Sequence, residues 1–192
     1  KELVFSVPSG NFGNICAGMV AREMGLPVSH FIAATNANKV VPNFMKNGTY
    51  KAEKSVATIS NAMDVGDPSN FVRILQMHEN EHGILEKGFS AYSFTDPQTK
   101  EAMRAIEKEH HYTADPHGAV GYLGLLEYQK NHPNTYGVFL ETAHPVKFLE
   151  VVEETLGKTL TIPKKIVEVL SKQKQATKIS DYQGLKRFLM QE

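Results

Sequence analysis

A run of small polar residues near the start of the chain has the composition of an anion-binding turn. Ser9, Gly10, Asn11 and Gly13 follow a short apolar stretch, and the pattern becomes helical from about Phe12. A strand, a glycine-rich turn and a helix in this order aim unpaired backbone N–H groups and a helix dipole at one point, which suits a phosphate. A tight turn that needs glycine for its backbone and Ser or Asn for local hydrogen bonds explains the same spacing equally well.

The glycine-rich run matches neither of the two commonest phosphate-binding motifs. It lacks the Lys that follows the last glycine of a Walker A loop, and its glycines do not have the spacing of the dinucleotide-binding fingerprint. Spacing alone therefore leaves two interpretations open, an anion seat and a structural turn.

The elements around this run predict an α/β fold. Leu3–Val7 and Val28–Ala34 have the apolar character of buried strands, and the helix between them carries Ile15 and Met19 on one face. A second helix is expected to begin near Asn38 and to stop at Asn47-Gly48. Alternating strands and helices favour a parallel sheet with helices on both faces.

Three Asp-Pro pairs precede predicted helices in the middle of the chain. Asp can cap a helix N-terminus, and Pro suits the first helical position. The pairs are Asp67-Pro68, Asp96-Pro97 and Asp115-Pro116, and the predicted helices are Ser69–Asn80, Gln98–His110 and His117–Lys130.

The third of these helices contains a glycine at every third position. Gly118, Gly121 and Gly124 each cost about 1 kcal/mol against Ala in a helix interior. A close approach by another helix or by a ligand is therefore expected to compensate, and helix–helix packing is the simpler of the two explanations.

The last predicted strand, Tyr136–Leu140, brings a second polar segment to the same edge of the sheet. Ligands of parallel sheets lie outside the carboxyl ends of the strands, and Thr142 and His144 occupy such an end. The following helix closes at Gly157. The sequence predicts a domain over residues 1–157 and a C-terminal helical extension, residues 158–192, that packs on it.

Composition narrows the classes of function. The 192 residues, 41% of them hydrophobic, suffice for one domain with a sizeable core. Twenty-one basic and twenty-one acidic residues cancel, which gives no electrostatic case for nucleic acid or for an anionic membrane. Cys16 is the single cysteine, and no apolar run is long enough to span a bilayer. A cytoplasmic location is expected.

Five segments together resemble threonine synthase of the bacterial and fungal type, a fold type II pyridoxal-phosphate enzyme. They occur in the family's order and at its approximate spacing: Pro8–Asn14, Phe31–Asn36, Ser60–Asp64, Pro116–Val120 and Thr142–Phe148. The resemblance covers nearly the whole chain. It implies part of a tryptophan synthase β-like large domain, a parallel sheet flanked by helices and closed by C-terminal helices.

The resemblance also implies an activity and a cofactor. The family's full-length enzyme is a pyridoxal 5′-phosphate-dependent carbon–oxygen lyase acting on phosphates. It converts O-phosphohomoserine and water into threonine and phosphate, the last step of threonine biosynthesis. The implied cofactor-binding residues are Ser9, Gly10, Asn11, Phe12 and Gly13, with Asn14 as a sixth member, around the cofactor phosphate, and Thr142 at the pyridine nitrogen. From its position alone, Thr142 is an ordinary helix N-cap.

The family's reactive lysine has no counterpart in this chain. In the family it lies before the matched region, and neither Lys39 nor Lys147 has matching surroundings. A Schiff base needs a suitably placed unprotonated amine. We therefore expect no catalytic residue here and no turnover by this chain alone. The missing N-terminal half would be its partner, and exposed sheet surface would favour self-association.

Two other functions stay open at this stage. One is a non-catalytic relative that binds a phosphorylated amino acid. The other is an interaction domain in which the glycine-rich run is only a turn. A longer reading frame that contains the Schiff-base lysine upstream would argue against the first, and bound phosphate or sulfate at Ser9–Asn14 would argue against the second.

Eight histidines require that metal binding be considered. The run His78-Glu79-Asn80-Glu81-His82 has the letters of the His-Glu-x-x-His zinc motif. Its flanks are polar, Gly83 follows, and no third ligand is evident, so we expect a solvated helix end and no metal site.

Four further polar residues stand near the expected site. His144 is expected to be structural, although an acid–base role beside the cofactor is an alternative, and His117 stands at a helix start where a phosphate could be met. Asn61 and Asp64 either line the pocket or shape the turn that contains them.

Overall fold

The computed structural model describes residues 1–190. The chain divides into two compact units, Lys1–Leu160 and Thr161–Glu192. The domain boundary expected after residue 157 stays a prediction.

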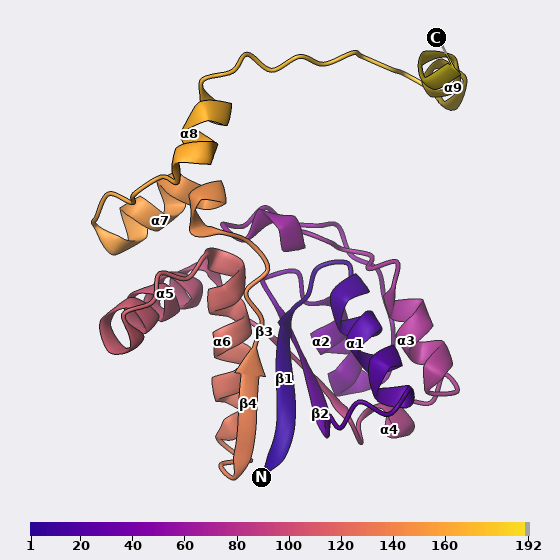
Figure 1. The fold of residues 1–192 in the computed structure, drawn as a ribbon. Coiled ribbons are helices and arrows are strands. Elements are labelled where there is room, and N and C mark those ends of the chain that lie inside the picture. The colour runs from indigo at the N-terminus through magenta and orange to yellow at the C-terminus, as the bar shows by residue number, and fades with distance from the viewer. Residues whose placement is uncertain (191–192) are drawn as a thin grey trace. The chain divides into compact units, whose positions relative to one another are not determined.

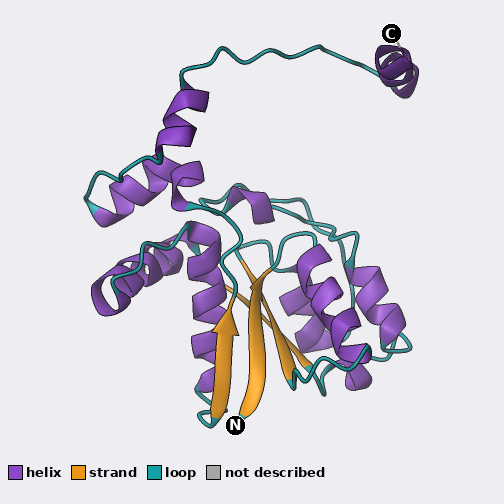
Figure 2. Ribbon diagram, in the orientation of Figure 1, coloured by secondary structure: helices purple, strands orange, loops and turns teal. Residues whose placement is uncertain are grey.

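A parallel sheet forms the centre of Lys1–Leu160, with strand order β3-β2-β1-β4 among the residues described (Figures 1 and 2). Its strands are β1 (Glu2–Pro8), β2 (His30–Thr35), β3 (Phe89–Ser93) and β4 (Thr135–Phe139). In the register, Phe5 of β1 pairs with Phe31 of β2 and with Val138 of β4. All carboxyl ends therefore meet at one edge. The predicted α/β class is confirmed.

The sequence-based prediction omits β3. This strand has only five residues, Phe-Ser-Ala-Tyr-Ser, and the small polar residues in it weaken the apolar signal. Phe89 and Ala91 are buried beside their partners Phe31 and Ala33 of β2. Pairing with a fully buried neighbour, and not local propensity, explains why this segment is a strand.

One face of the sheet is covered by α1 (Gly13–Glu23) and α2 (Val40–Asn47), with α3 (Phe71–Met77) and α4 (His82–Leu85) on the same side (Figure 1). The core on this side contains Ile15 of α1, Phe31 of the sheet and Phe71 of α3, each at most 2% exposed. Phe71 makes an edge-to-face contact with Phe44 of α2, with the ring centroids 5.3 Å apart. Apolar packing thus places α1 behind the end of β1.

The other face is covered by α6 (Pro116–Gln129), and α5 (Asp96–His110) packs on α6 (Figure 1). A Cβ at Gly124 would lie 2.7 Å from Ala34 Cβ and 2.8 Å from Ser6 Oγ. A Cβ at Gly121 would lie 3.3 Å from Pro8 Cδ. The α6 glycines therefore allow close approach to the sheet, and the expected helix–helix explanation is wrong.

The Asp-Pro pairs behave differently from one another. Asp115 caps α6, because its Oδ1 accepts a hydrogen bond from the His117 amide at 2.8 Å. In α5 the cap is Thr95, which forms a capping box with Gln98, and Asp96 is already helical. Asp67-Pro68 caps no helix, since α3 starts only at Phe71 after Asn70.

The predicted helix Ser69–Asn80 is shorter in the structure. It ends at Met77 because Glu79 and Asn80 adopt left-handed backbone angles, with φ of 57° and 60°. A second short helix, α4, then starts at His82.

The remaining elements follow the expected order. After β4 come a 3₁₀ turn, η2 (Pro145–Phe148), and α7 (Leu149–Leu156), which Gly157 ends with φ of 64°. Thr161–Glu192 contains α8 (Lys164–Leu170) and α9 (Tyr182–Met190). Asp181 caps the start of α9, where its Oδ1 accepts from the Gly184 amide at 2.7 Å.

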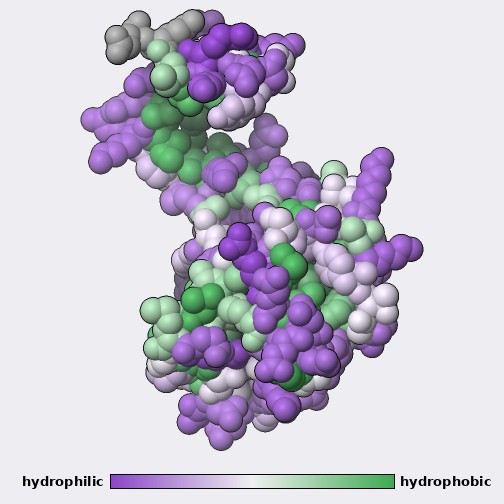
Figure 3. All heavy atoms as spheres, turned by 90° about the vertical axis from the view of Figure 1, so that its right-hand side faces the viewer, coloured by the Kyte–Doolittle hydropathy of each residue, from purple (hydrophilic) through white to green (hydrophobic). Residues whose placement is uncertain are grey.

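The side of the molecule drawn in Figure 3 is mainly hydrophilic in Lys1–Leu160, with hydrophobic residues in small separate areas. Across residues 1–190, none of the helices combines the length and the apolar composition that crossing a bilayer requires.

Candidate functional site

The glycine-rich turn continues the sheet before it leaves it. The Ser9 amide donates to the Ala34 carbonyl of β2 at 2.8 Å, and the Ser9 hydroxyl donates to the Val7 carbonyl at 2.8 Å. The Ser9 amide therefore already has an acceptor within the protein and is not free to bind a ligand. Any anion seat must be formed by the amides that follow it.

Phe12 turns the chain into α1 with a left-handed backbone, φ 60° and ψ 14°. This conformation is unfavourable for a bulky residue, so its surroundings must stabilise it. The Phe12 side chain is 4% exposed and packs edge-to-face on Phe71, with the ring centroids 5.6 Å apart. Burial of the ring thus anchors the strained turn.

Six consecutive backbone amides, those of residues 10–15, donate to no protein acceptor within residues 1–190. The first turn of α1 also has no side-chain cap and no acidic residue. Orphan amides and the positive end of a helix dipole therefore converge on the same place, which is the arrangement that binds a phosphate.

A cavity of about 230 Å³ lies in front of these amides and is called the phosphate seat here. Its lining contains all seven residues predicted to bind the cofactor: Ser9, Gly10, Asn11, Phe12, Gly13, Asn14 and Thr142. Pro8, Ile15, Ala62, Met63 and His117 complete it. Residues from both ends of Lys1–Leu160 meet here because β1 and β4 are neighbours in the sheet.

The wall opposite the glycine-rich turn is η1 (Asn61–Met63), a single 3₁₀ turn. A Cβ at Gly10 would lie only 2.6 Å from Met63 Cα and 3.1 Å from the Ala62 carbonyl oxygen. A side chain at position 10 would collide with the backbone of η1, so only glycine fits there.

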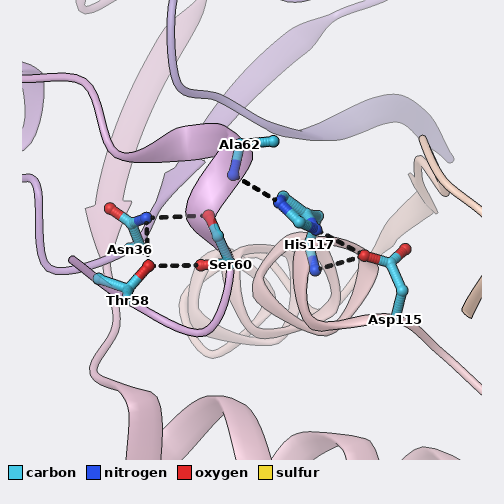
Figure 4. A network of polar contacts seen from close by, with 6 residues as sticks. All are labelled: Asn36, Thr58, Ser60, Ala62, Asp115 and His117. Atoms are coloured by element: carbon cyan, nitrogen blue, oxygen red, sulfur yellow. Dashed lines mark hydrogen bonds and ion pairs between the residues drawn. The ribbon is translucent and has the colours of Figure 1, made fainter. Parts of the chain in front are cut away.

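A partly buried polar network holds this wall in place, and Figure 4 shows its contacts among Asn36, Thr58 and Ser60. Asp64 Oδ1 accepts from Asn36 Nδ2 at 2.9 Å and from Thr58 Oγ1 at 2.7 Å, while Oδ2 accepts from the Thr58 amide at 3.0 Å. Asn36 also donates to the Ser60 carbonyl at 3.3 Å. Asp64 therefore shapes the turn and does not line the seat, and Asn61 is exposed outside it.

His117 joins the wall to α6 (Figure 4). Its Nε2 lies 3.2 Å from the Ala62 amide nitrogen, and its Nδ1 lies 2.6 Å from Asp115 Oδ1. Because an amide can only donate, Nε2 is the acceptor and Nδ1 carries the hydrogen. Both ring nitrogens are thus engaged by the protein, so His117 forms a wall of the seat and does not offer a ring N–H to an anion there.

An acidic pair beside His117 was not predicted from the sequence. Asp115 is fully buried, and Glu141, the residue before Thr142, has both carboxylate oxygens buried. Burial first, and then the neighbouring Asp115 carboxyl group, raise the pKa of Glu141 to about 8. Burial opposes ionisation of Asp115 too, but hydrogen bonds from His117 hold its pKa below the ordinary value. The signal in the sequence that could have identified Glu141 is its position directly after a predicted parallel strand.

The other histidines considered lie outside the seat. His144 is exposed, and its Nδ1 accepts from the Val146 amide at 3.1 Å, so it caps η2. His78 and His82 lie on different sides of the α3–α4 break. Their ring nitrogens contact the Ile74 carbonyl at 2.8 Å and the Met45 carbonyl at 3.1 Å.

The seat fits a phosphate monoester and carries no fixed counter-charge. Its lining within residues 1–190 contains no Lys or Arg, and neither Lys39 nor Lys147 is part of it. Binding there must come from backbone amides, the α1 dipole and hydroxyl groups. Thr142 lines the same cavity.

Two protein families match this chain. The profile described as pyridoxal-phosphate dependent enzyme matches residues 3–140, and the one described as threonine synthase, C-terminal, matches residues 118–189. The first profile covers the glycine-rich turn, η1 and β4, and it stops two residues before Thr142.

Curated relatives agree with the family profiles. Threonine synthase of Escherichia coli strain K12 is 46% identical over 169 residues, which make up 88% of this chain and 38% of that protein. Threonine synthase of Buchnera aphidicola subsp. Baizongia pistaciae is 40% identical over 192 residues, 100% of this chain and 44% of that protein. The chain thus spans about two fifths of the length of these relatives.

Solved structures show the same architecture. The crystal structure of threonine synthase from Escherichia coli superposes with a TM-score of 0.86 at 41% identity, over 98% of this chain and 44% of that one. A pyridoxal-phosphate-bound threonine synthase from Brucella melitensis gives a TM-score of 0.88 at 27% identity, over 98% of this chain and 46% of that one.

Proposed function

The chain belongs to the pyridoxal-phosphate-dependent enzymes and, among them, to the threonine synthases, and from this membership we propose that it forms the cofactor-phosphate side of a threonine synthase active site. The reaction of the full-length enzyme is the conversion of O-phosphohomoserine and water into threonine and phosphate. The observation that carries the proposal is that residues 10–15, whose backbone amides are unpaired, all line the phosphate seat.

Each residue of the seat has a separate part in this proposal. The amides of Gly10 to Ile15 bind the cofactor phosphate, and Gly10 permits the close wall at Met63. The Thr142 hydroxyl serves the pyridine nitrogen, as the resemblance to the family implies. When bound, pyridoxal 5′-phosphate supplies the electron sink for negative charge that develops on the amino-acid substrate.

The proposal includes a limit on what this chain does by itself. A Schiff base requires a lysine amine, and none of the lysines within residues 1–190 lines the seat. We expect the chain alone to bind the cofactor through its phosphate and to release no phosphate from O-phosphohomoserine. Turnover above background in a phosphate-release assay would contradict this part.

Calorimetric titration of the chain tests the binding step. Pyridoxal 5′-phosphate should bind at least about tenfold more tightly than pyridoxal, because only the former has a phosphate for the charge-assisted hydrogen bonds of the seat. Inorganic phosphate should compete. Equal affinity for the two compounds, or binding unaffected by inorganic phosphate, would overturn the assignment of the seat.

A further inference from the structure

Three carboxylate oxygens are buried together beside the phosphate seat without a donor. Within the described chain, Asp115 Oδ2 and both Glu141 oxygens find no hydrogen-bond partner among ordinary N–H and O–H groups. Asp115 is 0% exposed. Buried acceptors left without a donor are costly, so such a cluster requires an explanation.

The two carboxyl groups meet at the first turn of α6. Asp115 is the N-cap of this helix. The Glu141 carboxyl group occupies the space where a Cβ of Gly118 would lie, so that any side chain there would collide with it. Gly118 thus admits a side chain from the end of β4 to the N-terminus of α6.

We propose that Asp115 and Glu141 share one proton, and that this hydrogen-bonded pair positions Thr142, on one side of the phosphate seat, relative to η1 on the other side. Two ionised carboxylates in contact repel, whereas one proton between them gives each a partner. Asp115 already accepts from the amide and the Nδ1–H of His117, which favours its charged form. Glu141 is therefore the proton carrier and donates to Asp115 Oδ2.

The pair connects residues that line the seat. Glu141 directly precedes Thr142, and Asp115 holds His117, whose Nε2 fixes the Ala62 amide of the opposite wall. The chain Glu141–Asp115–His117–Ala62 thus runs from the end of β4 to η1. Loss of the shared proton would leave two adjacent negative charges at this junction and would move Thr142 away from α6.

The neighbouring ionisable groups do not neutralise the pair. His117 faces Asp115 through Nδ1. The phenol of Tyr112 also lies near both carboxyl groups, and its pKa is raised mainly by burial and further by the charges of Glu141 and Asp115. The retained proton agrees with the pKa of Glu141, which burial first and then Asp115 raise to about 8.

Carbon-13 NMR of the chain labelled at glutamate Cδ tests the shared proton directly. We expect one glutamate carboxyl to titrate near pH 8 and its resonance to disappear in Glu141→Gln, while the exposed control Glu150→Gln leaves it in place. Gly118→Ala, which displaces the carboxyl from α6, should return the midpoint toward the ordinary glutamate value of about 4.3. Titration of Glu141 at that ordinary value in the unaltered chain would overturn the proposal.

The positioning role has its own readout, which rests on the proposed function. If pyridoxal 5′-phosphate needs the protonated pair, its apparent Kd should rise by up to about tenfold per pH unit above the Glu141 midpoint. Glu141→Gln, which keeps a donor toward Asp115, should bind with an affinity close to that of the unaltered chain at pH 7 and lose this pH dependence. An identical pH dependence in both proteins would contradict the positioning role.

The two tests separate the two proposals. Failure of pyridoxal 5′-phosphate to bind at any pH would remove the proposed function, but the NMR titration would still decide whether the proton is shared. Normal cofactor binding with an ordinary Glu141 titration would remove the shared proton and leave the proposed function standing.

Discussion

The Nε2 atom of His117 accepts a hydrogen bond from the Ala62 amide, with a nitrogen–nitrogen distance of 3.2 Å. This contact joins the first turn of α6 to η1, two segments that are separated in sequence by α3, α4, β3 and α5. Because Asp115 Oδ1 fixes the Nδ1 side of the ring, the imidazole can present only its lone pair to Ala62.

His117→Phe tests this connection. Phe preserves packing on Phe148, whose ring centroid lies 4.6 Å from that of His117, but it removes both the acceptor for the Ala62 amide and the donor to Asp115. The Ala62 amide should then exchange with deuterium faster, and the free energy of unfolding should fall by about 1–3 kcal/mol. The exposed control His144→Phe should leave Ala62 unchanged; similar exchange at Ala62 in both variants would contradict the contact.

Two glycines of the same turn should respond differently to an added methyl group. Gly10→Ala places a Cβ 2.6 Å from Met63 Cα, and this overpacking should lower the free energy of unfolding by about 1–3 kcal/mol. Gly13→Ala places its Cβ 3.5 Å from Asn70 Nδ2, an ordinary contact, and should change stability by less than about 1 kcal/mol. Denaturant unfolding compares the two, and equal losses would argue against the close wall at η1.

His30 should make the fold sensitive to acid. Burial, with the charges of His132 and Arg22, lowers its pKa to about 4, well below the ordinary value of 6.5. Since the unfolded chain takes up the proton first, the stability that this neutral histidine contributes is present above pH 6.5 and is lost as pH falls to about 4. The total is about 3 kcal/mol at most.

His30→Phe isolates this contribution. Phe can keep the stacking on Tyr128, whose ring centroid lies 4.5 Å from that of His30, although Ser90 Oγ loses its partner at 2.8 Å. Thermal unfolding of the variant should depend less on pH between 6.5 and 4 than that of the unaltered chain. The same pH dependence in both proteins would rule out His30 as the source.

The edge of the sheet should promote association of this chain with itself. β4 pairs only with β1 in the part of the chain that the structure describes, and Tyr136 on it is 64% exposed. An unpaired edge strand with an exposed aromatic residue is a template for pairing with another copy. Light scattering at rising concentration should show a mass above 21.4 kDa, and Tyr136→Lys should reduce it. A constant monomer mass would contradict this expectation.

The sequence revealed the parts of the site that local physics determines. Gly10 and Gly13 after an apolar strand indicated the turn. Thr142 follows the last strand, and because parallel strands end at one edge of the sheet, it was expected beside this turn. The helix Val40–Asn47 also followed from periodicity and from Gly48.

Features that depend on contacts between distant segments were not predictable in this way. The strand β3 forms because β2 supplies its hydrogen-bonding partner. Gly124 is needed because Ser6 and Ala34 of the sheet lie too close to α6 for a side chain at that position. Glu141 and Asp115 each look like ordinary acidic residues in the sequence. Only the packing of β4 against the start of α6 makes them a buried pair.

The strand order β3-β2-β1-β4 has a consequence for how the chain reaches its native state. β1 is made first and β4 last of the four, yet they are adjacent, so their pairing must close nearly the whole of Lys1–Leu160 into a loop. Contacts of such long sequence separation form slowly. The cofactor should therefore recognise only chains in which β1 and β4 have paired, and its binding would report this closure.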